Sequence, residues 1–269
     1  MINAKKPKII FHIPHSSNVI PDDIREQFSL QQYELDQQVK LLTDWYTSDL
    51  FSSAVHARGV AIEFPISRIV VDPERFQVDS QEPMSGVGMG VLYTRTTHGD
   101  LMRPKVFTQG QHRKALLDTY YNPHHEALTN LVKDQLEQHQ HALIIDCHSF
   151  PANPLPYEMN KTGQRPDICI GTDDFHTPPW LTYNLEKAFK ALGYSVAINS
   201  PFAGSLVPLN YYGKHKSVYS IMIEVNRSTY MNEENLEKSE RFDSIRTDIS
   251  QAINKATTLF ANHGALISP

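Results

Sequence analysis

The chain has 269 residues, of which 40% are hydrophobic and 20% charged, as in ordinary water-soluble globular proteins. The formal net charge is −5 and lysine and arginine form no block, so a nucleic acid or an anionic membrane surface is not an expected partner. No apolar run is long enough to span a membrane, and two cysteines make no disulfide framework. We therefore expect a cytoplasmic protein. No repeat or linker composition divides it, which favours one domain over residues 1–269.

The first predicted strand covers residues 8–13 and is apolar after its first residue apart from His12. Pro14 holds the preceding residue in extended geometry, and the strand is expected to end there. His15 follows at once, just beyond the carboxyl edge of the strand, where ligands bind in α/β sheets. His12 and His15 lie on a strand-to-loop path, so their side chains need not converge. We expect His12 in the core or behind the residues that contact a ligand.

Apolar residues recur at helical spacing from residue 31 to residue 54, which predicts one amphipathic helix. Asp44 interrupts the apolar face of this helix, within the segment Thr43-Asp44-Trp45. On the pattern alone, a carboxylate in such a helix is expected to be solvated.

Two further strands are predicted at residues 55–62 and 69–71. The second runs directly into the charged segment Asp72-Pro73-Glu74-Arg75, and Arg68 stands just before it. Residues 77–102 are rich in glycine, serine, threonine and methionine without periodicity. A loop of this length in a compact domain is usually functional or mobile.

A helical pattern spans residues 107–139 and contains Pro123, which is expected to break it. The adjacent residues His124 and His125 point in different directions on a helix, so at most one of them can face a site.

The central strand is predicted at residues 142–145, a run buried on both faces, and it leads into Asp146-Cys147-His148-Ser149. Asp146 and His148 are two residues apart, so they point to the same side of an extended chain. This geometry suits a histidine metal ligand with an aspartate that orients it. The same residues also fit a strand-end aspartate that caps a turn beside an ordinary histidine.

The remaining elements are three strands and two helices, predicted as strands at 167–170, 194–198 and 219–223 and as helices at 178–192 and 235–262. The last strand also ends in chemically active residues, because Glu224 follows it directly and the segment continues through Arg227 to Tyr230.

Four buried runs therefore lead into polar segments, at residues 14–17, 72–75, 146–149 and 224–230. We expect these segments to meet at one edge of an α/β sheet. Two histidines and one carboxylate with an open fourth position form a common catalytic zinc site. A further glutamate can act as a general base there, and an arginine can hold a substrate carboxylate in bidentate fashion.

The motifs resemble those of the N-formylglutamate amidohydrolase family, in family order from about residue 11 to residue 231. They are Ile13-Pro14-His15-Ser16, Thr43-Asp44-Trp45, Ser67 to Asp72 with Arg75, Asp146 to Ser149, Gly171-Thr172-Asp173, and Glu224 with Ser228 to Met231. This resemblance implies an α/β protein with a three-layer α/β/α architecture and a mixed central sheet, as in zinc carboxypeptidases. It also implies a metal-dependent amidohydrolase of N-formyl or N-acyl amino acids.

The resemblance further implies roles for the residues that match the motifs. His15 and His148 become metal ligands with Asp44 as the third, and the divalent ion is expected to be zinc. Glu224 becomes the general base. His125 is a candidate for stabilising the oxyanion, although a structural role fits its context better.

Substrate contacts are implied for Arg75, which would hold a carboxylate of a small-molecule substrate, with assistance from Arg68. Arg227 and Tyr230 are further candidates. The chain departs from the family pattern at Asp-Pro-Glu-Arg, where these deformylases usually have Asp-Leu-Asn-Arg. Glu74 adds a negative charge beside the proposed carboxylate clamp, and Arg227 would balance it if its side chain points inward.

Three alternatives remain open on the sequence. Asp72 and Asp146 compete with Asp44 as the third metal ligand. The scaffold can serve a non-catalytic ligand-binding domain, or a hydrolase of a different N-acyl amino acid or of a short peptide. The sequence does not indicate an oligomeric state.

Overall fold

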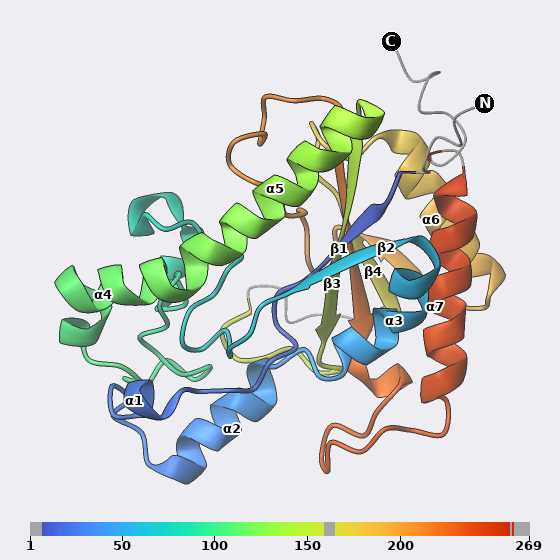
Figure 1. Ribbon diagram of the computed structural model, residues 1–269. Helices are drawn as coiled ribbons and strands as arrows, with labels where there is room; N and C mark the ends of the chain where they lie inside the picture. Colours follow the sequence, from blue (N-terminus) through green and yellow to red (C-terminus); the bar gives the residue numbers. More distant parts are fainter. Residues whose placement is uncertain (1–6, 159–164, 259, 261–269) are drawn as a thin grey trace.

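The computed structural model describes residues 7–158, 165–258 and 260, and its named strands form one six-stranded sheet (Figure 1). The strands are β1 (Ile9–Ile13), β2 (Gly59–Glu63), β3 (Ala142–Phe150), β4 (Ile168–Gly171), β5 (Val196–Ile198) and β6 (Val218–Asn226). Their order is β2-β1-β3-β6-β4-β5. The first four in this order run parallel, whereas β4 is antiparallel to β6 and parallel to β5. The sheet is mixed, as predicted.

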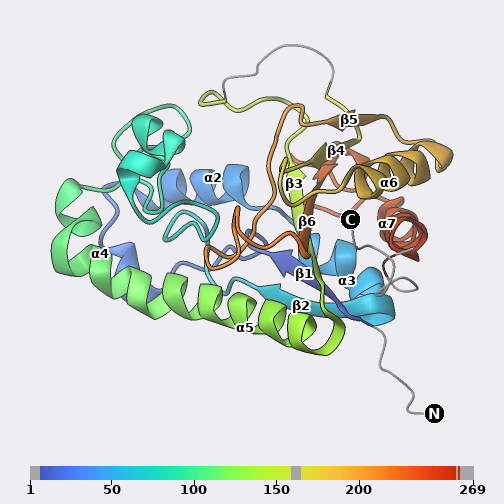
Figure 2. The same cartoon turned by 90° about the horizontal axis from the view of Figure 1, so that it is seen from above.

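Helices cover both faces of the sheet (Figure 2). One face carries α3 (Thr47–Arg58), α6 (Pro179–Ala191) and α7 (Phe242–Ala256), and the other carries α5 (Asn122–His139). On the first face Phe51 and Ile249 belong to one apolar cluster with Phe11. On the second face Leu128 packs in a cluster with Ile10. Adjacent residues of β1 thus enter different cores, which explains why its apolar residues are consecutive up to His12 and confirms the three-layer architecture.

A third apolar cluster lies beyond the end of β1, among the shorter helices (Figure 1). These are α1 (Asp22–Arg25), α2 (Gln32–Leu42) and α4 (Gly110–Leu116), with the 3₁₀ turns Asp79–Gln81, Pro83–Val87 and Lys105–Thr108; a further 3₁₀ turn, Arg227–Thr229, directly follows β6. Met89, Leu92 and Tyr93 from the long loop are buried in this cluster. The loop at residues 77–102 is therefore folded against its own core. No helix in the described ranges is both long and apolar enough to cross a bilayer.

The strand predicted at residues 69–71 is wrong, because this segment forms a buried turn. The Val70 amide donates to the Ser67 carbonyl at 2.9 Å. The carbonyls of Ile69 and Val70 accept bonds of 3.0 and 3.1 Å from the guanidinium of Arg103. A buried backbone must satisfy its polar groups, and here a side chain does what a neighbouring strand would do.

The single helix predicted at residues 31–54 is also wrong, because α2 ends at Leu42 and α3 begins at Thr47. Tyr46 has a left-handed φ of 64°, which turns the chain between the two helices. Asp44 lies in this connection, where its amide donates to the His15 carbonyl at 2.9 Å. It is only 2% exposed, so the expected solvated carboxylate is instead buried beside His15.

Other predicted boundaries shift as well. The strand predicted from residue 55 begins only at Gly59, because α3 continues to Arg58. The central strand continues to Phe150, so the residues from Asp146 to Ser149 lie in β3 instead of a loop. Pro123 does not break the long helix: a wider π turn at Leu117–Tyr121 joins α4 to α5, and the proline sits in the first turn of α5. The last helix begins at Phe242 instead of residue 235, after a turn in which Leu236 has a φ of 62°. Its predicted end at residue 262 lies outside the described residues.

Candidate active site

Parallel strands bring the candidate residues to one pocket. His15 follows β1 and His148 lies on β3. Glu224 on β6 is the register partner of His148. All three line a pocket of about 380 Å³ that Asp44 and Arg68 also line. This volume falls within the range of small-molecule sites.

The His15 imidazole is held by a buried carboxylate. Its Nε2 donates to Oδ1 of Asp72 at 2.9 Å, and the residue is 1% exposed. Its Nδ1 has no hydrogen-bond partner and lies 3.7 Å from Oδ2 of Asp44. A histidine that donates through one nitrogen to a carboxylate and keeps the other free is arranged like a metal ligand.

The His148 imidazole lies between carboxylates on both sides. Its Nδ1 is 3.1 Å from Oδ2 of Asp44, and its Nε2 is 3.2 Å from both Oδ1 of Asp146 and Oε2 of Glu74. Burial lowers the pKa of His148, but the negative charges of Glu74 and Asp146 reverse this and hold it well above its usual value. The site therefore stabilises positive charge at this position.

Asp44 is the carboxylate that both imidazoles share. Burial raises its pKa, but the hydrogen bond to His148 and the nearby imidazole of His15 outweigh burial and hold the pKa well below its usual range. Its Oδ1 accepts from Nη2 of Arg227 at 3.2 Å. Nη1 of Arg227 donates to the Leu41 carbonyl at 2.8 Å. Arg227 thus lines the pocket with its guanidinium already bonded to Asp44 and to the backbone.

Two groups of described residues have ligand atoms close enough to hold a cation. His15, Glu74 and His148 form one group, and His12, Glu74 and Asp146 form the other. In each group the ligand atoms lie within 4.8 Å of one another. Asp44 belongs to neither group, although it contacts both His15 and His148. Sequence reasoning did not place Glu74 among the ligands, and its position two residues after Asp72 was the only signal for it.

Glu224 is suited to accept and return a proton near neutral pH. It is 7% exposed, and its Oε2 has no hydrogen-bond partner. Burial raises its pKa to about 8; the positive charge of His148 opposes this rise and the negative charge of Asp44 adds to it. A carboxylate with a raised pKa that lines a pocket has the properties of a general base.

Asp72 connects the arginines to the imidazole of His15. Its Oδ2 accepts from Nη2 of Arg68 at 2.9 Å and from the hydroxyl of Tyr93 at 2.7 Å. Nε of Arg75 is 3.7 Å from the same oxygen, too far for a hydrogen bond, and has no hydrogen-bond partner. Arg75 is therefore the freer of the two arginines to meet a ligand. No sequence pattern indicated the contact between Tyr93 and Asp72, because Tyr93 lies in a loop without hydrophobic periodicity.

Two of the candidate residues lie outside the lining of this pocket. Nε2 of His125 donates to the Pro73 carbonyl at 2.8 Å, and its ring stacks on Tyr121. The hydroxyl of Tyr230 donates to the Trp45 carbonyl at 2.7 Å, and Tyr230 is fully buried. His125 thus supports the segment that carries Glu74, and Tyr230 supports the segment that carries Asp44.

Solved structures share this fold. An N-formylglutamate amidohydrolase from Ralstonia eutropha JMP134 superposes with a TM-score of 0.79 at 20% identity, covering 98% of this chain and 97% of that one. A protein from Agrobacterium tumefaciens superposes with a TM-score of 0.70 at 16% identity, covering 96% and 92%. The chain therefore belongs to the same structural class of α/β fold as these two proteins.

Sequence comparison assigns the family within that class. The model of the N-formylglutamate amidohydrolase family matches residues 8–231. An N-formylglutamate deformylase of Pseudomonas putida is 26% identical over 247 residues, which are 90% of this chain and 86% of the relative. The chain belongs to the N-formylglutamate amidohydrolase family, which confirms the resemblance seen in its motifs.

Proposed function

We propose that the protein hydrolyses the amide bond of N-formylglutamate or of a closely similar N-acyl amino acid, with a divalent ion held by His15, His148 and Asp44. The observation that carries this proposal is the convergence of two imidazole nitrogens on one carboxylate oxygen. Nδ1 of His148 and Nδ1 of His15 lie 3.1 and 3.7 Å from Oδ2 of Asp44. Ligands of a tetrahedral zinc ion at about 2.0–2.1 Å are about 3.3 Å apart, between these two values.

The surroundings of the two imidazoles support this ligand set. The opposite ring nitrogens contact other carboxylates, Asp72 for His15 and Asp146 for His148. Carboxylates in this position orient histidine ligands and fix their tautomers. Two imidazoles with one carboxylate also form the set that zinc takes in many hydrolases, which favours zinc over harder ions.

The chemistry divides between the ion and Glu224. A zinc ion held by His15, His148 and Asp44 would supply Lewis-acid chemistry, activating water near neutral pH and polarising the acyl carbonyl. Glu224 takes the proton of the attacking water and returns it to the leaving amine as the C–N bond breaks. Its buried Oε2, which has no partner, is available for this proton. The products are the free amino acid and the carboxylic acid of the acyl group.

Arg75 holds the substrate carboxylate in this proposal. Its Nε has no hydrogen-bond partner, and its side chain lines the pocket that contains His15, His148 and Glu224. A guanidinium offers a planar fork that matches a carboxylate in bidentate fashion. Arg68 contributes positive charge but is already bonded to Asp72 and Tyr93.

A hydrolysis assay with metal analysis tests the proposal. Purified protein is stripped with a chelator, reloaded with zinc, and supplied with N-formyl-L-glutamate, and glutamate release is followed. We expect release only from the loaded protein, and release slowed by about 10²-fold or more in loaded Glu224→Gln. Equal glutamate release from stripped and loaded protein would show that hydrolysis does not depend on a metal ion. Absence of release from every member of a panel of N-acyl amino acids would show that the protein does not hydrolyse such amides.

The third ligand is tested separately, because Glu74 also lies close to His15 and His148. The variants Asp44→Asn and Glu74→Gln keep the shape of each side chain and weaken it as a ligand. We expect zinc affinity at the His15–His148 pair to fall in Asp44→Asn and to persist in Glu74→Gln. The reverse result would assign Glu74 as the third ligand.

A further inference from the structure

A second set of potential ligands lies beside the proposed centre, on the other side of His148. His12 on β1, Asp146 on β3 and Glu74 from the segment after Asp72 bring their ligand atoms within 4.8 Å of one another. Nδ1 of His12 is 2.8 Å from Oδ1 of Asp146 and 3.5 Å from Oε1 of Glu74. His12 is fully buried and Asp146 is 1% exposed.

The proposed first centre does not account for all of this set. Asp44 provides its carboxylate, which leaves Glu74 without a ligand role there. Oε1 of Glu74 is buried and has no hydrogen-bond partner. A buried carboxylate oxygen without a donor is costly unless a cation or another partner satisfies it. This oxygen lies 3.5 Å from Nδ1 of His12, while the other oxygen of Glu74 lies 3.2 Å from Nε2 of His148.

The spacing of the atoms fits a cation. Ligand atoms around a divalent ion bound at about 2.0–2.1 Å are about 3.3 Å apart, and the two distances from Nδ1 of His12 lie on either side of this value. Nε2 of His12 also lies 2.9 Å from Nε2 of His124. That contact fixes the ring from behind and leaves Nδ1 directed at the two carboxylates, as a supporting contact does for a histidine ligand.

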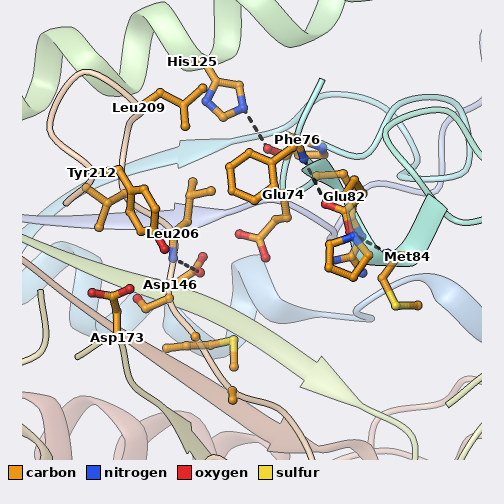
Figure 3. A pocket seen from close by; sticks show the side chains of 18 of the residues that line it. Glu74, Phe76, Glu82, Met84, His125, Asp146, Asp173, Leu206, Leu209 and Tyr212 are labelled. Atoms are coloured by element: carbon orange, nitrogen blue, oxygen red, sulfur yellow. Dashed lines mark hydrogen bonds between the residues drawn. The ribbon is translucent and has the colours of Figure 1, made fainter. Parts of the chain in front are cut away.

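An entry path leads to this set. Glu74 and Asp146 line a second pocket of about 360 Å³, which adjoins the one that contains His15 and shares Glu74 and Arg75 with it. Figure 3 shows their carboxylates side by side within this pocket, with Phe76, Leu206 and Tyr212 around them. The pocket has room for the water molecules that complete the coordination of a divalent ion.

We propose that His12, Glu74 and Asp146 form a second divalent-cation site, next to the centre of His15, Asp44 and His148. One imidazole and two carboxylates suit Mn²⁺, Co²⁺ or Zn²⁺. Binding replaces the proton that Nδ1 of His12 shares with Asp146 and releases it to solvent. The ion also neutralises the negative charge of Glu74 beside Arg75. The proposal goes beyond the proposed hydrolysis, which needs only the first ion.

The test is the number of ions bound by the full-length protein. Chelator-stripped protein is dialysed to equilibrium against Mn²⁺ and, separately, against Zn²⁺, and bound metal is measured by mass spectrometry. We expect two equivalents in the wild type, one in His12→Gln and one in Glu74→Gln. Asp44→Asn is expected to weaken the first site and keep the second. Each variant is expected to keep one bound ion, and this retained ion shows that the variant protein is folded.

A buried histidine outside both groups provides the matched control. His141 is 8% exposed at the end of the sheet where β3 begins, and His141→Gln is expected to keep two equivalents. Saturation of the wild type at one equivalent would overturn the second site, as would two equivalents in both His12→Gln and Glu74→Gln. One ion with hydrolysis of N-formylglutamate would overturn the second site alone. Absence of any bound ion would overturn the proposed metal-dependent function as well.

Discussion

His148 and Glu224 are register partners on the adjacent parallel strands β3 and β6. Both strands are buried over nearly their whole length, so the two side chains are carried by the most constrained part of the sheet. A proposed metal ligand and a proposed base on paired strands keep a fixed separation. Sites on rigid strands hold their geometry better than sites on loops.

Replacing Glu224 by glutamine is expected to abolish turnover while metal binding persists. Glutamine keeps the shape and a hydrogen-bonding capacity but cannot accept the proton of water. We expect kcat to fall by a factor of about 10² or more, which is the range of general-base catalysis. Parallel measurement of kcat and metal content checks this. Full activity in the metal-loaded variant would remove Glu224 from the role of base.

Removing either proposed imidazole ligand is expected to remove the first ion. In His15→Ala and His148→Ala the ligand set loses one of three protein donors, so zinc affinity collapses while the fold persists. Zinc analysis after dialysis, with circular dichroism of each variant, checks both statements. His141→Gln, which alters a buried histidine elsewhere, is expected to bind zinc as the wild type does. Stoichiometric zinc at the first site in His15→Ala or His148→Ala would show that the missing imidazole is not a ligand.

The carboxylate behind His15 is expected to control metal affinity without touching the ion. Asp72 accepts from Nε2 of His15 and from Arg68 and Tyr93. In Asp72→Asn the amide no longer provides the negative charge that holds this imidazole, and affinity for zinc is expected to fall by about 10- to 100-fold. A competition titration with a chromogenic chelator measures the change. Unchanged affinity with lowered thermal stability would limit Asp72 to a structural role.

Arg75 is expected to bind a carboxylate of the substrate. Lysine keeps its charge but loses the planar fork, so Arg75→Lys should lower kcat/KM for carboxylate-bearing substrates and leave metal content unchanged. Comparing an N-acyl amino acid with its amide, on the wild type and the variant, isolates this contact. If both compounds lose activity equally, Arg75 acts only through its neighbour Asp72, 3.7 Å away.

The parts of the site that a sequence pattern can predict are those set by local rules. The apolar run of β1, ended by Pro14, places His15 at the edge of the sheet. The alternation of an extended chain puts Asp146 and His148 on one side. These local rules hold because both strands are covered on their two faces by helices, so burial and periodicity agree.

Nonlocal contacts set the rest, and no local pattern records them. Asp44 has a helical sequence context, but its buried position depends on the bond between its amide and the carbonyl of His15. Residues Ile69 and Val70 resemble a strand, but their carbonyls bond to Arg103, more than thirty residues later. Glu74 became a candidate ligand only when the turn after Asp72 placed it beside His12 and His148.

Arg103 is expected to be essential for the stability of the segment that carries Arg68 and Asp72. It is fully buried, and burial lowers its pKa to about 9. Its guanidinium satisfies the carbonyls of Ile69 and Val70 and stacks 4.3 Å from the ring centre of Phe28. In Arg103→Met the side chain keeps an apolar stem, but two buried carbonyls lose their donors. Each such loss costs about 1–3 kcal/mol, so the free energy of unfolding should fall by about 2 kcal/mol or more.

Urea denaturation of the metal-loaded protein measures this loss, and Lys133→Met serves as the control. Lys133 is 61% exposed, so its replacement should leave the free energy of unfolding within about 0.5 kcal/mol of the wild type. Because the released turn also holds Arg68 and Asp72, zinc affinity in Arg103→Met should fall together with stability. An Arg103→Met protein as stable as Lys133→Met would show that water or a rearranged backbone satisfies the two carbonyls. In that case the strand-like residues would not owe their turn to the buried guanidinium.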